Sequence, residues 1–347
     1  MTAIDTLLNL SAPYAAVDEA DADLFARAMA EADAWHRSRN ARYAALWSTA
    51  QRPLIPVDLF KHTDLSTPLP GPGMWLGSSG TSSGQATRVF FDATSLARIE
   101  HGMRHIFASA GLPETRPSRF LLLSPDPAVG DAPGYATSFA RYTACAPVAE
   151  CVFAVDAAGR FDAEAAWATL RRWGQDPAPV YLFGLTVWFE QLALHAPASL
   201  PMAGPVKGLT GGGWKGLVST LERPQIMARL RACFGSDAVD IRDIFGLTEH
   251  PLHYIACPHG HFHLPRYSRF DIVGTDGMPV ADGEAGLIRL QNPFFASLPA
   301  HDLLTADMGR RGRDCACGSP LPYLVFMGRA GATGDICAAH ARKGQDV

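Results

Sequence analysis

Short apolar runs alternate with helix-like segments through the middle of this chain of 347 residues, and this alternation limits the fold more than any other feature. The expected strands are residues 88–92, 120–124, 151–155 and 180–183, and the expected helices are residues 95–110, 163–173 and 186–194. Strands joined by helices in this way form βαβ units, which share one parallel sheet with helices on its faces. The alternation therefore predicts a layered α/β fold.

The two ends of the chain lack this alternation of strands and helices. Apolar side chains recur at helical spacing over residues 17–47 and predict a helix, and the prolines that follow predict an irregular crossing. After residue 204 the apolar runs are short, with turn signals at Asp276-Gly277 and Asp282-Gly283. The strands expected there are residues 207–210, 239–245, 254–257, 270–273 and 286–290. We therefore expect a helical N-terminal segment, an α/β subdomain, a β-rich and more antiparallel subdomain and a short tail, over residues 1–70, 71–203, 204–329 and 330–347.

Composition excludes several classes of protein. Hydrophobic residues make up 48% of the chain and charged residues 18%, which is the balance of a folded globular protein. A net charge of -4 without a basic tract argues against a nucleic-acid partner. No apolar run approaches the roughly 18 residues of a bilayer span, so we expect no membrane association. The N-terminus shows no secretion signal and the seven cysteines are odd in number, so we expect a cytoplasmic protein without a disulfide framework.

Glycines and hydroxyl side chains fill residues 77–85, between an apolar segment and the alternating run 88–92. Glycine allows positive φ, so that successive N–H groups can point at one anion, and the hydroxyls add further donors. We interpret this segment as a phosphate-binding loop, with a flexible Ser/Gly linker as the alternative. No Lys-Ser/Thr pair follows its glycines, so it is not a Walker A sequence.

Three later motifs each have a structural and a ligand-binding interpretation. Thr210–Gly216 holds three glycines after an expected strand, where they either bend the chain or let it approach a flat ligand such as adenine. Asp243–Glu249 is an apolar strand followed by a glycine turn, a hydroxyl and a carboxylate, which either face solvent or serve a purine and Mg²⁺. Leu304–Gly309 is a strand end that delivers one carboxylate, either as a cap or as a ligand for ribose hydroxyls.

In this order and spacing the motifs resemble those of the adenylate-forming (ANL) enzymes, over roughly residues 70–330. The Gly-Gly-Gly-Trp-Lys-Gly run from Gly211 and the short chain are similar to the acyl-protein synthetases of bacterial luminescence. The segments Cys257–His263 and Cys315–Gly318 are similar to relatives of phenylacetate-CoA ligase. The resemblance implies the layered N-terminal domain of that superfamily, with its C-terminal lid domain absent or vestigial.

The resemblance also implies roles in binding ATP and Mg²⁺. The loop residues that would hold the β- and γ-phosphates are Ser78, Ser79, Gly80, Thr81, Ser82, Ser83 and Gly84. The residues around adenine and ribose would be Gly211, Gly212, Gly213, Asp243, Phe245, Gly246 and Asp307, with Phe245 stacking on adenine and Asp307 holding the ribose. Glu249 would bind Mg²⁺, Thr248 would lie near the α-phosphate, and Arg329 would act at the hinge.

The chain departs from the family pattern at several points. Arg88 stands near the place of the lysine that usually follows the phosphate loop, and Thr-Gly-Asp is here Thr-Ala-Asp. The catalytic lysine of full-length members lies in the C-terminal domain, and 18 residues follow Arg329 here. Of the four lysines in the chain, we expect Lys215, inside a motif, rather than Lys343 to take that role.

The implied activity is ATP-dependent activation of a fatty or aromatic carboxylic acid as an acyl-adenylate, with transfer to a thiol acceptor. A protein or carrier thiol is the expected acceptor, as in an acyl-protein synthetase. One alternative is an acyl- or aryl-CoA ligase. The other is a non-catalytic nucleotide-binding partner of a reductase or carrier protein.

Two further groups of cysteines are candidates for chemistry. A tetrahedral, structural Zn²⁺ site is expected from Cys257, His263, Cys315 and Cys317, because Zn²⁺ prefers thiolate and imidazole ligands. His259 or His261 can replace His263, and reduced cysteines in a turn are the alternative. Cys337 is a candidate acyl acceptor, by resemblance to the tail cysteine of the luminescence enzymes, or an incidental cysteine.

Overall fold

The computed structural model describes residues 2–47, 52–77, 87–129, 133–212, 219–235 and 239–330. The chain forms two compact units: unit 1 is Met1–Ser109 with Gly246–Val347, and unit 2 is Ala110–Phe245. The chain passes from one unit to the other after Ser109 and after Phe245. The boundaries that we expected from the sequence were at residues 70, 203 and 329. Within the described ranges, no helix is long and apolar enough to cross a membrane.

Unit 2 is built on a parallel sheet with the strand order β5-β4-β6-β7-β8. Its elements are β4 (Ser118–Leu123), α6 (Gly134–Tyr142), the 3₁₀ turn η1 (Thr143–Cys145), β5 (Val148–Phe153), α7 (Ala163–Trp173), β6 (Val180–Leu185), α8 (Thr186–Leu194), β7 (Val206–Gly211), α9 (Arg223–Phe234) and β8 (Val239–Leu247). The predicted layered α/β fold is confirmed here, and the helices α7 and α8 have the bounds that the sequence predicts. Helix α9, which the sequence analysis did not predict, completes the layer.

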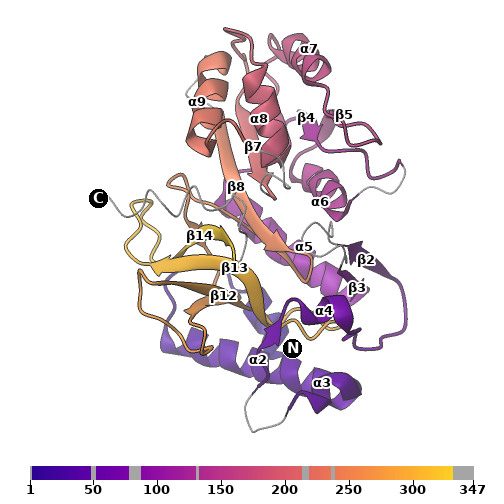
Figure 1. Ribbon diagram of the computed structural model, residues 1–347, viewed down its shortest axis with the longest axis vertical. Helices are drawn as coiled ribbons and strands as arrows, with labels where there is room; N and C mark the ends of the chain where they lie inside the picture. The colour runs from indigo at the N-terminus through magenta and orange to yellow at the C-terminus, as the bar shows by residue number, and fades with distance from the viewer. Residues whose placement is uncertain are drawn as a thin grey trace. The chain divides into compact units, whose positions relative to one another are not determined.

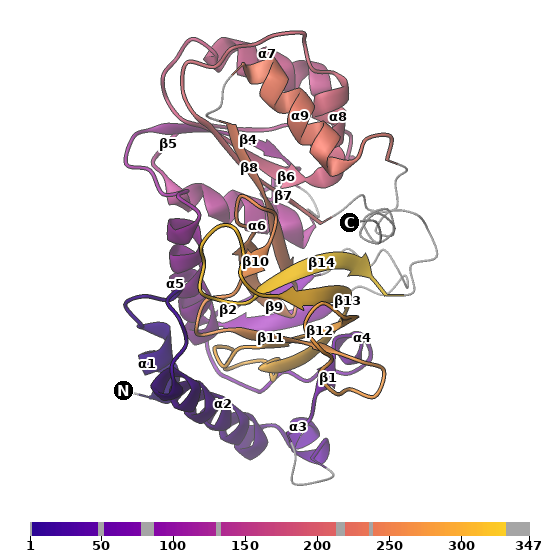
Figure 2. The same ribbon diagram turned by 90° about the vertical axis from the view of Figure 1, so that its left-hand side faces the viewer.

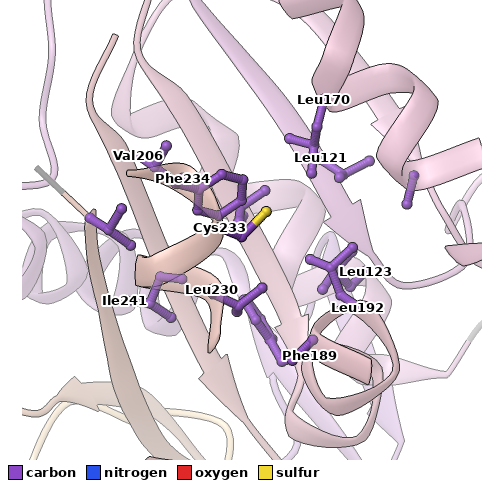
Figure 3. Packing of buried hydrophobic residues seen from close by; sticks show 14 of the residues in the cluster. Leu121, Leu123, Leu170, Phe189, Leu192, Val206, Leu230, Cys233, Phe234 and Ile241 are labelled. Carbon is purple, nitrogen blue, oxygen red and sulfur yellow. The ribbon is translucent and has the colours of Figure 1, made fainter. Parts of the chain in front are cut away.

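The sheet of unit 2 is covered on both faces. On one face, apolar side chains of α7, α8 and α9 point toward those of the strands, as Figure 3 shows for Leu170, Phe189, Leu192, Leu230, Phe234, Leu121, Leu123, Val206 and Ile241. On the other face, Tyr142 of α6 packs edge-on against Phe183 at a ring distance of 6.2 Å. Each fully buried Leu or Phe contributes about 1.5–3 kcal/mol, so this double layer holds the carboxyl ends of the strands rigidly in place.

Unit 1 is built on an antiparallel sheet with the strand order β10-β14-β13-β12-β11, in which β1 pairs with β13 in parallel (Figures 1 and 2). Its elements are α1 (Ala3–Leu8), α2 (Glu19–Arg39), α3 (Ala41–Ala45), β1 (Ile55–Pro56), α4 (Leu59–His62), β2 (Gly73–Gly77), β3 (Arg88–Asp92), α5 (Ala93–Ser109), β9 (His250–Ile255), β10 (Phe262–His263), β11 (Arg269–Val273), β12 (Ala285–Gln291), β13 (Asp302–Gly312) and β14 (Tyr323–Arg329). Strands β2 and β3 form a separate antiparallel pair, and β8 carries the chain from unit 2 to β9.

The helix predicted over residues 17–47 is two helices, α2 and α3, separated at Asn40. The Asn40 side chain accepts a hydrogen bond from the N–H of Tyr43 and donates one to the carbonyl of Leu65 at 2.8 Å. These bonds favour an extended backbone at Asn40, which ends α2 and caps α3. Helix α2 lies along the sheet of unit 1 (Figure 2), with the Arg269 guanidinium of β11 4.1 Å from the ring centre of Phe25.

Candidate functional site

Two buried carboxylates, Glu249 and Asp307, interact within unit 1. Their residues are 4% and 8% exposed, and the charge of Glu249 contributes to the raised pKa of Asp307. Glu249 stands in the turn between β8 and β9, and Asp307 stands inside β13. Two acidic groups that are withdrawn together from water favour a cation or hydrogen-bond donors between them.

Burial is the largest influence on the acidity of both groups. It raises the pKa of Glu249 above its ordinary value, while the hydroxyl of Thr87 and the charges of Lys61 and Arg329 oppose the rise. Burial also raises the pKa of Asp307 to about 6, again opposed by Arg329. Two residues outside the sequence motifs, Lys61 and Thr87, therefore belong to the same cluster.

Lys61 lies in no sequence motif. It is far along the chain from Glu249, Asp307 and Arg329, so only the fold brings it near them. It belongs to α4, where its side chain is 14% exposed and its Nζ is 2.7 Å from a carboxylate oxygen of Asp58. The scarcity of lysine in the chain, four in all, is the one sequence signal that singles it out.

Strands β13 and β14 are neighbours (Figure 1), and Asp307 of β13 is the cross-strand partner of Arg329 of β14. The expectation that Leu304–Gly309 ends a strand is wrong, because β13 continues to Gly312 and pairs with β12 and β14 on its two sides. The hydroxyl of Thr305 accepts a hydrogen bond from the N–H of Asp307 at 3.1 Å. Asp307 is therefore held on a rigid strand opposite a cation rather than in a flexible turn.

Gly246 also differs from its expected role. It lies inside β8 rather than in a turn, and the turn falls on Thr248, which is half-buried, and Glu249. A Cβ at Gly246 would lie 1.9 Å from Cδ2 of the His253 ring, a contact that no side chain tolerates. The glycine is required because an imidazole packs directly on the backbone of β8.

Replacing Gly246 with alanine should therefore destabilise the protein by about 2–4 kcal/mol, since the new methyl group overlaps the His253 ring. Urea denaturation of the variant measures this loss. The double variant Gly246→Ala/His253→Ala should recover at least half of it, because the second change removes the overlap. A double variant that is less stable than Gly246→Ala alone would contradict this explanation.

Four other motif residues lie in unit 2. Gly211 ends β7, where a Cβ would lie 2.7 Å from the carbonyl oxygen of Ile244, and Gly212 has a φ of 68° that favours glycine. Asp243 forms an ion pair with Arg223. Phe245 is buried, with 6% exposure. The glycines thus follow a strand as predicted and allow the close approach of two backbone segments.

Several predicted residues lie outside the described part of the chain. They are Ser78, Ser79, Gly80, Thr81, Ser82, Ser83, Gly84, Gly213, Lys215, Lys343 and Cys337. The strands on either side of the Ser/Gly segment are described: β2 and β3 pair antiparallel, with Gly77 opposite Arg88. The Arg88 guanidinium lies 4.6 Å from the ring centre of Trp75, on the same strand pair.

The four predicted zinc ligands come together in unit 1. The ligand atoms of Cys257, His263, Cys315 and Cys317 all lie within 4.8 Å of one another. The sulfurs of Cys257 and Cys315 are 3.8 Å apart, and the sulfur of Cys317 is 3.2 Å from Nε2 of His263. The edge of a tetrahedron with Zn–S bonds of about 2.3 Å measures about 3.8 Å, so the spacing fits a tetrahedral ion.

The histidine of this cluster can be assigned from its hydrogen bonds. Nδ1 of His263 lies 3.1 Å from the carbonyl oxygen of Leu321, to which it donates in the tautomer that leaves Nε2 as a free ligand atom. Nδ1 of His261 instead lies 3.2 Å from the sulfur of Cys315, and its ring stacks on Tyr323 with centres 4.0 Å apart. This geometry favours His263 as the ligand and His261 as a hydrogen-bond donor to a thiolate.

Backbone turns shape the cluster. Gly260 and Gly318 have φ values of 79°, and Asp314 is the only non-glycine residue in the described ranges with positive φ. The N–H of Gly318 donates to the carbonyl of Cys315 at 2.9 Å, which closes the tight Cys-x-Cys-Gly turn between β13 and β14. Aspartate is one of the few residues other than glycine that adopts positive φ readily, so Asp314 suits a tight turn.

Comparisons with known proteins place these features in a family. The family model of the acyl-protein synthetases, LuxE, matches residues 46–340. No curated protein sequence matches the chain.

Solved structures share the fold at low identity. A 2-hydroxyisobutyryl-CoA ligase in its postadenylation state has a TM-score of 0.63 and 14% identity, over 89% of this chain and 68% of the ligase. The O-succinylbenzoate coenzyme A synthetase of Bacillus subtilis, solved with ATP and magnesium, has a TM-score of 0.50 and 14% identity, over 76% and 52% of the two chains. A long-chain-fatty-acid-CoA ligase of Archaeoglobus fulgidus has a TM-score of 0.51 and 13% identity, over 74% and 51%. The chain thus spans about half the length of the last two enzymes.

Proposed function

Because this chain belongs to the LuxE family of acyl-protein synthetases, we propose that it activates a carboxylic acid with ATP and transfers the acyl group to a thiol. The observation that carries this proposal is the buried pair Glu249 and Asp307 with the cations Lys61 and Arg329 beside it. The reaction joins two anions, a carboxylate and a triphosphate, so it needs positive charge and oriented donors more than covalent chemistry.

The donor set fits a magnesium nucleotide. A buried carboxylate with a raised pKa, such as Glu249, gains from a divalent cation, and carboxylate oxygen is a ligand that Mg²⁺ prefers. When bound, Mg²⁺ neutralises phosphate charge. Asp307, ionised above pH 6, accepts hydrogen bonds from ribose hydroxyls, and Thr305 holds its backbone in place. Arg329 and Lys61 supply positive charge for phosphate oxygens.

Fatty and aromatic acids both remain candidate substrates, and a protein or carrier thiol is the proposed acceptor. In this scheme a thiolate takes the acyl group from the acyl-adenylate, and AMP leaves with the bonding electrons. Cys337 is the candidate for an acceptor within the chain. A CoA ligase is the second candidate function, because the similar structures include CoA ligases.

The test of this function is acid-dependent exchange of pyrophosphate into ATP, run over a panel of fatty and aromatic acids with Mg²⁺. Exchange with at least one acid would support the proposal. Binding of ATP without exchange for any acid would instead favour a nucleotide-binding partner of a reductase or carrier. Adding CoA or a carrier protein to the active mixture then distinguishes the acceptors by the thioester that accumulates.

Asp307 should set a pH dependence of stability. Its pKa in the folded protein, about 6, is above the ordinary 3.8, so folding favours the protonated form. The contribution of Asp307 to the free energy of unfolding is complete below pH 4 and is lost as the pH rises through 6. The native protein then loses about 3 kcal/mol of stability. Asp307→Asn cannot ionise, so at pH 8 without nucleotide its Tm should exceed that of the native protein by about 5 °C, while its affinity for ATP falls. Thermal melts of both proteins at pH 5 and pH 8 measure their Tm difference at each pH. The same Tm difference at both pH values would contradict this prediction.

We also propose that Cys257, His263, Cys315 and Cys317 bind a structural Zn²⁺ ion. Four protein ligands leave no open position, so the ion would hold the β13–β14 turn rather than take part in the reaction. Three thiolates require a reducing compartment, which agrees with a cytoplasmic location. Elemental analysis of the purified protein should find one zinc per chain.

A further inference from the structure

The first residue of β9, His250, is an imidazole buried in unit 1 directly after the proposed Mg²⁺ ligand Glu249. His250 is 0% exposed, and its Nε2 lies 2.7 Å from the hydroxyl oxygen of Tyr254, which is also 0% exposed. Its ring packs perpendicular to that of Phe295, with centres 5.3 Å apart. Its Nδ1 has no hydrogen-bond partner within the described residues, so the hydroxyl of Tyr254 is the polar group that orients this ring.

Tyr254 is itself held by a chain of buried polar groups. Its hydroxyl forms a hydrogen bond with the side chain of Ser268. Nδ2 of Asn292 donates to the hydroxyl of Ser268 and to the carbonyl of Tyr267, both at 3.0 Å. Oδ1 of Asn292 accepts from the N–H of Phe294 at 2.9 Å, so both ends of this amide are used and its orientation is fixed. The chain is therefore rigid from Asn292 to Tyr254.

The turn that carries Glu249 is held on both of its sides by imidazoles of β9. On the β8 side, Gly246 lies so close to the ring of His253 that a Cβ there would be 1.9 Å from Cδ2. On the β9 side, His250 follows Glu249 and is bonded to Tyr254. Apolar packing has no preferred direction, whereas a hydrogen bond restrains both distance and direction. The bond to Tyr254 therefore restricts where the turn can place the Glu249 carboxylate.

We propose that His250 is a positioning residue for magnesium: with Tyr254, it holds the turn so that the Glu249 carboxylate meets the Mg²⁺ ion of MgATP. The inference rests on the proposed function, in which Glu249 binds that ion. Mg²⁺ accepts ligands only near octahedral positions at about 2.0–2.1 Å, so a carboxylate that is free to shift is a weaker ligand. Groups that orient a metal ligand typically contribute about 10- to 100-fold in metal affinity.

The experiment measures how the binding of ATP depends on Mg²⁺, by calorimetry over a series of Mg²⁺ concentrations. Tyr254→Phe removes the hydroxyl and keeps the ring, His250→Phe removes both ring nitrogens, and His250→Gln keeps an amide that can hydrogen-bond to Tyr254. We expect the half-saturating Mg²⁺ concentration to rise about tenfold in Tyr254→Phe and His250→Phe, and about threefold in His250→Gln. The affinity for ATP without Mg²⁺ should stay unchanged in all three variants, because the turn then holds no ion.

Tyr43→Phe is the matched control. Tyr43 is another tyrosine of unit 1 with 0% exposure, and its hydroxyl donates to a carboxylate oxygen of Asp33 at 2.6 Å. Both tyrosine variants lose a buried hydrogen bond and should lose stability, which thermal melts measure. Only Tyr254→Phe should change the Mg²⁺ requirement, because Tyr43 has no bond to the turn that carries Glu249 among the described contacts.

The outcomes separate this inference from the proposed reaction. A native protein that binds MgATP without exchange would overturn the reaction, while a raised Mg²⁺ requirement in Tyr254→Phe would still support the positioning role. If Glu249→Gln loses the Mg²⁺ dependence and Tyr254→Phe keeps the native one, the inference is wrong and the reaction stands. An equal change in Tyr43→Phe, or a native protein whose ATP binding does not respond to Mg²⁺, also overturns it. If His250→Phe does not fold, Tyr254→Phe and His250→Gln decide the question.

Discussion

Glu249→Gln should lower acid-dependent exchange of pyrophosphate into ATP at least about 100-fold, with little change in Tm. The amide keeps the shape of the side chain but loses the charge that a divalent cation needs. Because burial raises the pKa of Glu249, the amide should fit the folded protein as well as the acid does. Initial rates at saturating Mg²⁺, with the best acid of the panel, measure the effect.

Glu284→Gln is the matched control, since Glu284 is an exposed acid of unit 1 on the turn before β12. Its exchange rate should equal that of the native protein. If Glu249→Gln retained most of the native exchange rate, Glu249 would have no place in cation binding, and the carboxylate pair would be structural.

Cys315→Ser should abolish zinc binding and lower the Tm by about 10 °C or more. The structural reason is that Cys315 is 6% exposed and its sulfur lies among groups of the 257–263 segment, 3.8 Å from the sulfur of Cys257 and 3.2 Å from Nδ1 of His261. Without an ion, the thiol and imidazole groups around the β13–β14 turn lose the partner that they share. Elemental analysis and differential scanning calorimetry measure the two effects.

His259→Ala provides the control for this prediction, and His263→Ala provides the comparison. His259 is exposed and outside the group of ligand atoms, so its replacement should leave both zinc content and Tm unchanged. His263→Ala should behave like Cys315→Ser. Full zinc content in Cys315→Ser, or loss of zinc in His259→Ala, would contradict the ligand assignment.

Local sequence predicts some elements of this fold fully. Helix α7 begins directly after Asp162, whose carboxylate caps the N–H of Ala165, and its apolar positions face the sheet. Helix α9 is not among the expected elements, although Glu222 and Gln225 form a capping box at its start and Gly235 ends it. These are local signals, so this helix could have been predicted. The break at Asn40 could not, because it depends on contacts with Leu65 and Thr67 that only the folded chain brings near.

The candidate site likewise contains residues that the sequence marks and residues that only the fold brings near. Glu249, Asp307 and Arg329 stand out in the sequence because each lies in a motif. Lys61 and Thr87 do not, because their role comes from nearness to Glu249 across long stretches of chain.

By itself, the sequence determined the parallel α/β layer and which cysteines and histidines are candidate metal ligands, since these follow from periodicity and ligand type. The tertiary structure alone decided which imidazole faces the thiolates, why Gly246 must be glycine inside a strand, and which cations lie near Glu249. These facts depend on distances between residues remote in the chain, which packing sets and local pattern does not encode.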